Sequence, residues 1–188
     1  MSTDGISFEN RLWSKEVRMA TQVGHSLSML TWALSHINSS ENLVSNVSKD
    51  IFLVHSRLMC EFLQVRPSNP QRDFSIADFD SNSLAEWPGV TSEERDLLIP
   101  LWELASTEVV HFSKMRTPEL LESIVPFDFS LENVRTLTLT IFSILSRFLL
   151  YVQSSTSRGV LELRAEAQRA TDLFNGVSTE VSPFLPPL

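Results

Sequence analysis

Residues 130–153 read SLENVRTLTLTIFSILSRFLLYVQ, and this stretch decides the fold class because it fits two periodicities. Thr136 to Thr140 alternates polar and apolar residues, as a half-buried strand does. A helical stripe runs much further along the chain, and it consists of Val134, Leu137, Ile141, Leu145, Phe148 and Val152. The longer pattern predicts a helix that follows a Ser130 cap and ends near Gln153.

The N-terminal part of the chain has a second long apolar stripe, which predicts a helix from Phe8 to Ile37. Its apolar residues recur at steps of three and four: Trp13, Val17, Ala20, Val23, Leu27, Leu30, Leu34 and Ile37. Such spacing places them on one face of a helix. Gly24 lies within the stripe, where it indicates either a close contact with another helix or a weak point.

A break at residues 38–40 separates this helix from the next one. Ser39 or Ser40 can cap the second helix, which we expect to end near Gln64, before the prolines at 67 and 70. The predicted core stripe of this helix consists of Leu43, Val47, Ile51, Val54, Leu58 and Phe62.

Residues 65–90 are rich in Pro, Ser, Asn and Asp, which predicts a long loop. Such loops are unusual in compact domains and often functional. We expect this one to pack on the rest of the protein through Phe74, Ile76, Phe79, Leu84 and Trp87.

Capping signals predict two further helices after the loop. Thr91 and Glu94 have the spacing of a capping box, and the helix from Ser92 towards Ser113 should be kinked or restarted by Pro100. Residues 117–126 begin with Thr-Pro-Glu, which favours a short helix.

The last predicted helix covers residues 158–174, and Gly176 fits a C-terminal stop. Its stripe consists of Val160, Leu163, Ala167, Ala170 and Phe174. The pattern as a whole predicts an all-α protein: an antiparallel bundle of four long helices with a short helix and a long ordered loop. We expect a single domain over residues 1–188, with a Pro-rich tail at 177–188.

The composition narrows the class of function. The net charge is −8, which disfavours binding to a phosphate backbone, and the only cysteine, Cys60, lies in an apolar stretch typical of an inert thiol. Residues 1–10 lack a basic region followed by an apolar core, so we expect a cytoplasmic protein that does not enter a membrane. The sequence indicates no cofactor and no metal site.

Five polar residues are candidates for a site: His55, Arg57, Asp73, His111 and Arg116. His55 flanks the predicted core stripe of the second helix, whereas Arg57 points roughly to the other side. Asp73 lies in the long loop and could orient an imidazole. These side chains either edge a polar pocket or are structural contacts that pin the loop.

His55-x-Arg57, Arg72-Asp73, Trp102, and His111 with Arg116 together resemble a group of uncharacterised, mostly bacterial helical proteins. That group is similar in outline to HEPN-like bundles, a superfamily that includes RNA-cleaving toxins and nucleotide-binding partners. The resemblance implies a helical fold and a spatial cluster of the five candidate residues.

The nuclease motif of that superfamily is not reproduced here. HEPN nucleases carry an Arg shortly before a His, whereas His111 and Arg116 run in the opposite order. Arg18 and His25 have a comparable spacing, but Met19 follows the Arg where a polar residue is usual. Nuclease activity is therefore not implied for this chain.

Three functions fit these observations. The first is a non-enzymatic helical module that binds a partner protein, a second copy of the chain or a small ligand. The second is a metal-independent RNase in which a His acts as general acid or base and an Arg stabilises the charge on phosphorus. The third is a structural or regulatory bundle whose polar cluster only pins the loop. We favour the first, because the common catalytic motifs are missing.

Overall fold

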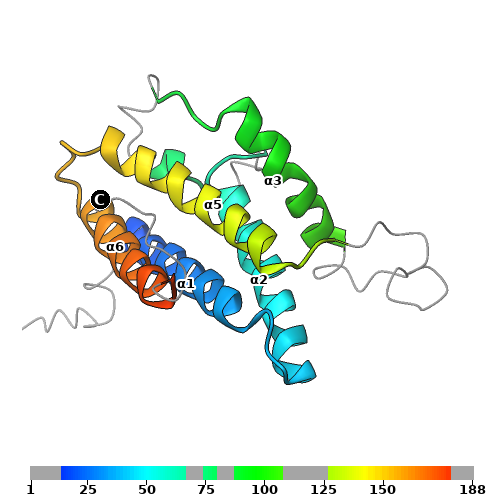
Figure 1. Cartoon of the computed structure of the whole chain (residues 1–188). Coiled ribbons are helices and arrows are strands. Elements are labelled where there is room, and N and C mark those ends of the chain that lie inside the picture. Colours follow the sequence, from blue (N-terminus) through cyan, green and yellow to red (C-terminus); the bar gives the residue numbers. More distant parts are fainter. Residues whose placement is uncertain (1–13, 67–73, 80–86, 108–126, 179–188) are drawn as a thin grey trace, which may run out of the picture.

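The computed structural model describes residues 14–66, 74–79, 87–107 and 127–178. These residues are all-α, as predicted. The α-helices are α1 (Lys15–His36), α2 (Asn42–Phe62), α3 (Ser92–Ala105), α5 (Leu131–Tyr151) and α6 (Arg158–Ser178), and a short 3₁₀ helix, η2 (Ile76–Asp78), lies between α2 and α3. Figure 1 shows α1 and α6 side by side, with α3 at the opposite side of the molecule.

Side-chain caps fix several helix starts. Thr91 and Glu94 form the predicted capping box, in which each side chain accepts the backbone N–H of the other residue. The Ser130 hydroxyl accepts the N–H of Asn133 at 3.3 Å, which confirms the predicted start of α5. Ser14 caps α1 in the same way. These contacts satisfy N–H groups that the first helical turn leaves without a partner.

Helices joined by short links run antiparallel, as predicted. Near the link between α1 and α2, the Ser45 hydroxyl donates to the Ile37 carbonyl at 2.8 Å, and further along the pair His55 meets Ser26. Phe142 of α5 packs on Phe174 of α6 with ring centroids 5.4 Å apart. The order of these contacts shows the opposite chain directions.

α1 and α6 are far apart in sequence and run parallel. Glu16 lies against Gly159 near the start of both helices, and Glu166 lies against Gly24 further along. A Cβ atom added at Gly24 would be 2.7 Å from the Cβ atom of Glu166. The close approach requires glycine, so the predicted contact at Gly24 is confirmed.

The core is formed mainly by the stripes of α1, α5 and α6. Every member of these three predicted stripes that the structure describes is buried. Thr138, in the stretch that alternates like a strand, is also fully buried, and its hydroxyl donates to the Val134 carbonyl one turn earlier. The helical interpretation of residues 130–153 is therefore correct.

The predicted core stripe of α2 is wrong. Leu43 is 75% exposed, Leu58 47% and Val47 40%, and of the predicted stripe only Phe62 is buried. The face that packs into the protein carries instead Ser48, Phe52, Leu53, Ser56, Met59 and Cys60. Both faces of α2 are apolar enough to be buried. The face that is buried carries two small residues, Ser48 and Ser56, which allow the neighbouring helices to come close.

Several predicted helix ends also need correction. The N-cap of α2 is Glu41 rather than Ser39 or Ser40, and the Ser39 hydroxyl accepts the Glu41 N–H instead. α3 is one continuous helix through Pro100, so the helix does not restart there. α6 continues through Gly176 to Ser178.

The predicted start of the first helix at Phe8 is wrong, because α1 begins at Lys15 after the Ser14 cap. Residues 8–13, 108–126 and 179–188, for which the sequence also gave predictions, lie outside the described residues.

The described parts of the loop at 65–90 are packed, as expected. Ile76 and Phe79 are buried, and Phe74 meets Phe79 edge to face with ring centroids 5.8 Å apart. Trp87 packs on Phe148 of α5 at 5.5 Å. Leu84 lies outside the described residues. Phe79 also meets Phe62 of α2 at 5.9 Å, so aromatic side chains anchor the middle and the end of the loop to the helices.

α5 is long and apolar enough to cross a membrane by length and composition. Half of its most apolar window is buried inside the protein, and the core helix of a folded domain passes the same test. Its apolar composition is explained by its place in the core, where Phe142, Ile144 and Phe148 are almost fully buried.

We predict that Gly24→Ala destabilises the protein, because the new methyl group would overlap the stem of Glu166 and push α1 from α6. Overpacking of this kind costs about 1–3 kcal/mol. Gly176→Ala is the matched control, since an added Cβ atom there meets nothing within 4 Å. Urea denaturation should show a lower free energy of unfolding for Gly24→Ala and a slightly higher one for Gly176→Ala. Equal stability of Gly24→Ala and wild type would contradict the close contact.

Candidate functional site

The structure separates the two candidate residues that it describes. His55 and Arg57 are both half-buried on α2, but His55 faces α1 whereas Arg57 faces α3. Asp73, His111 and Arg116 lie outside the described residues, so the proposed cluster of five stays a prediction. The expectation that Arg57 points away from His55 is confirmed.

His55 makes a polar contact between α2 and α1. Its Nδ1 atom lies 3.2 Å from the hydroxyl oxygen of Ser26, which is buried. The ring of His25 meets the ring of His55 edge to face, with centroids 5.4 Å apart. Burial lowers the pKa of His55, and the charge of His25 lowers it further. Neutral pH therefore favours an uncharged imidazole at this position.

Arg57 belongs to a second polar contact, between α2 and α3. Its Nε atom donates to Oε1 of Glu61 at 2.9 Å, and the indole N–H of Trp102 donates to the same oxygen at 3.2 Å. The guanidinium of Arg66 lies 4.4 Å from the centre of the Trp102 ring, and that of Arg57 lies at 5.9 Å. Cation–π attraction and a shared carboxylate thus hold α3 against the end of α2.

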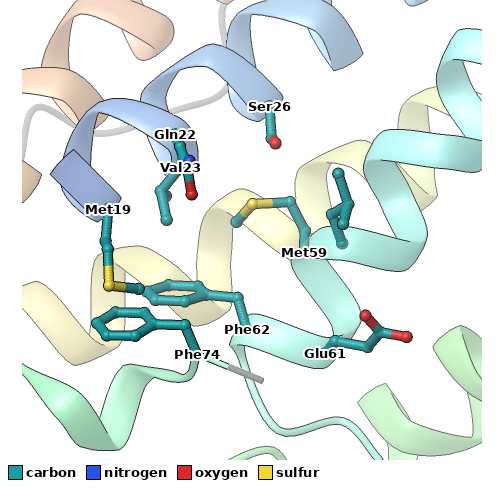
Figure 2. Close-up of a pocket in the computed structure, with 9 residues that line it drawn as sticks. Met19, Gln22, Val23, Ser26, Met59, Glu61, Phe62 and Phe74 are labelled. Carbon is teal, nitrogen blue, oxygen red and sulfur yellow. The ribbon is translucent and has the colours of Figure 1, made fainter. Parts of the chain in front are cut away.

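An open pocket of about 240 Å³ lies between these two contacts. Its wall comes from α1, α2 and the loop, and it is lined by Met19, Gln22, Val23, Ser26, Leu58, Met59, Glu61, Phe62 and Phe74. Figure 2 shows Met19, Gln22, Val23 and Ser26 on one side and Met59, Glu61 and Phe62 on the other. The lining is mainly apolar, with a few polar groups among it, which is typical of ligand pockets.

The two polar contacts meet the pocket at different points of its wall. Ser26 lines the pocket and contacts His55, while Glu61 lines it and is held by Arg57 and Trp102. Neither His55 nor Arg57 itself lines the pocket. They lie behind the residues that do, where His55 contacts Ser26 and Arg57 contacts Glu61.

The sequence did not show that these residues form a pocket, and those that it singled out, Val23, Leu58, Phe62 and Phe74, were assigned to packing. Met19 and Phe74 come from segments that are distant in the chain, and the packing of the loop against α1 and α2 brings them together. Leu58 was assigned to the core, whereas it is 47% exposed at the pocket. The only signal available was the group of aromatic residues in the loop.

The described residues contain no group of His, Cys, Asp and Glu side chains that could hold a metal ion. Burial raises the pKa of Cys60 to about 12, so its thiol stays protonated and unreactive. Comparison of the chain with protein-family models, with curated proteins and with solved structures finds no match.

We predict that His55 makes the protein less stable in mild acid. Its pKa in the folded chain lies below the ordinary value of 6.5, so the unfolded chain binds the proton more tightly. The contribution of neutral His55 to the free energy of unfolding is fully present above pH 6.5. It is lost as the pH falls from there through the lowered pKa of the folded chain.

Urea denaturation from about pH 7.5 to pH 5 tests this prediction against His55→Gln, which keeps a polar group near Ser26. The free energy of unfolding should fall more steeply for the wild type than for the variant. Parallel curves would show that His55 titrates as an unperturbed histidine.

Proposed function

We propose that the chain is a non-enzymatic helical module and that its pocket receives an apolar group of a partner protein. The pocket between α1 and α2 carries this proposal, because its lining is mostly apolar and it opens beside exposed Leu58. Met19 and Met59 supply flexible, polarizable walls that adapt to side chains of different shape. Gln22 and Glu61 offer polar atoms to the backbone of such a partner.

The chemistry around Ser26 supports binding rather than catalysis. Ser26 and His55 lie at the distance of a nucleophile and its base. Ser26 occupies the middle of α1, however, where the backbone N–H groups bond within the helix and leave no donors for an oxyanion. The described contacts of His55 also include no carboxylate that would orient its ring.

The other two functions have unequal support. The RNase hypothesis depends on His111 and Arg116, which lie outside the described residues, and no described contact favours it. A structural role has a specific observation in its favour: the contacts of His55 and Arg57 join α2 to α1 and to α3. Such a role for these two side chains is compatible with binding in the pocket between them.

Methionine methyl groups give a direct test of the pocket. With ¹³C-methyl methionine in the chain, we expect added indole, a probe for an aromatic side chain, to shift the signals of Met19 and Met59. Met29 does not line the pocket and is the internal control. Leu58→Lys places a charge at an exposed edge of the pocket and should weaken binding by about tenfold or more. Unchanged Met19 and Met59 signals at millimolar indole would overturn the proposal.

A further inference from the structure

The outward face of α2 carries a row of five apolar residues, which we name the outer stripe: Leu43, Val47, Ile51, Val54 and Leu58. At 3.6 residues per turn they fall on one side of the helix, opposite the buried face. Leu43 is 75% exposed, and Ile51 and Val54 are half-buried. Figure 1 shows the first turns of α2 at the lower edge of the molecule, beyond the end of α1.

The order of residue types in the outer stripe is the same in both directions, and the spacing differs only by where its one three-residue step falls. It reads Leu-Val-Ile-Val-Leu, at steps of four, four, three and four. Two copies of α2 that cross antiparallel about a point between Asp50 and Ile51 would place each Leu43 opposite Leu58 of the other copy, because these two residues lie equally far from that point. Val47 would lie opposite Val54 in the same way. A symmetric dimer needs a surface that is complementary to itself, and this stripe meets that condition.

We infer that the outer stripe binds a second copy of the chain, in an antiparallel two-fold dimer centred between Asp50 and Ile51 of each α2. This inference rests on the proposed function, because it names the group that the pocket receives. Leu58 belongs both to the stripe and to the pocket lining. Leu43 of the second copy lies against Leu58, at the edge of the pocket, so each site is completed by a residue of the other copy.

The charges near the stripe fit an association of modest strength. Residues 42–48 carry no charge, so two copies meet there without burying an ionised group. Exposed Asp50 lies beside this centre and would come close to Asp50 of the other copy next to the two-fold axis. Each chain also has a net charge of −8. Repulsion opposes the dimer, and salt should strengthen association by screening it.

Sedimentation equilibrium of the full chain, from about 1 to about 300 µM, measures the association directly. We expect the wild type to pass from monomer to dimer in this range, and Leu43→Glu to weaken the dimer about tenfold or more. Leu161→Glu is the matched control, because Leu161 is 49% exposed in the first turns of α6. It places the same charge near a helix start outside the stripe.

Mixing two variants tests the antiparallel register. In a mixture of Leu43→Glu and Leu58→Lys chains, the mixed dimer places one Glu opposite one Lys and keeps one native leucine pair. We expect the mixture to dimerise more tightly than either variant alone. A parallel pairing would place the Glu opposite an unchanged Leu43, so a mixture no tighter than its components would overturn the register.

Indole binding separates this inference from the proposed function. We expect Leu43→Glu to bind indole more tightly than the wild type at high protein concentration, because the second copy no longer covers the pocket edge. A wild type that stays monomeric at about 300 µM while indole still shifts Met19 and Met59 overturns the dimer and leaves the pocket proposal intact. A dimer sensitive to Leu161→Glu but not to Leu43→Glu also overturns the inference.

Discussion

The close parallel contact between α1 and α6 determines how the rest of the structure is arranged. Gly24 of α1 and Gly159 of α6 let the two helices approach so closely that Glu166 and Glu16 lie directly against the opposite helix. A Cβ atom at Gly24 would remove that fit. This face of α1 packs on α6. The neighbouring edge of α1, which carries Met19 and Ser26, therefore faces α2. The site therefore depends on a contact that lies outside it.

Two polar residues of α2, His55 and Arg57, do not line the pocket but contact residues that do. His55 meets Ser26, and Arg57 meets Glu61, so each acts on a residue that lines the pocket. Trp102 extends the second contact to α3. Contacts of this kind restrict the rotamers of the lining side chains, which preserves the shape of an otherwise adaptable wall of methionine and phenylalanine. The binding role that we propose for the pocket is thus compatible with a structural role for His55 and Arg57.

α2 differs from the other long helices because it has two apolar faces. One face is buried, and it contains Ser48 and Ser56, both fully covered. The other is the outer stripe, which stays partly exposed in the single chain. A helix of this kind can join the core of its own chain and a second surface at the same time. The pocket lies at the end of the stripe, so the same helix links the site to the proposed interface.

The sequence alone determined the helices of this protein. Apolar stripes at helical spacing placed α1, α5 and α6 and identified their buried faces, and the Thr91–Glu94 and Ser130 caps fixed two helix starts. These features could be predicted because periodicity and capping act within a few residues of the chain. The sequence also marked His55 and Arg57 as candidate site residues, although only through a pattern of residue types.

The tertiary structure decided which face of α2 is buried, the parallel contact of α1 with α6, and the pocket. Each depends on how distant segments fit together. Periodicity cannot choose between two apolar faces of one helix, because the choice is made by the shape of the neighbouring helices. Nor does the spacing within either helix show that Ser26 of α1 and Glu61 of α2 line one pocket, since they meet only when α1 packs on α2.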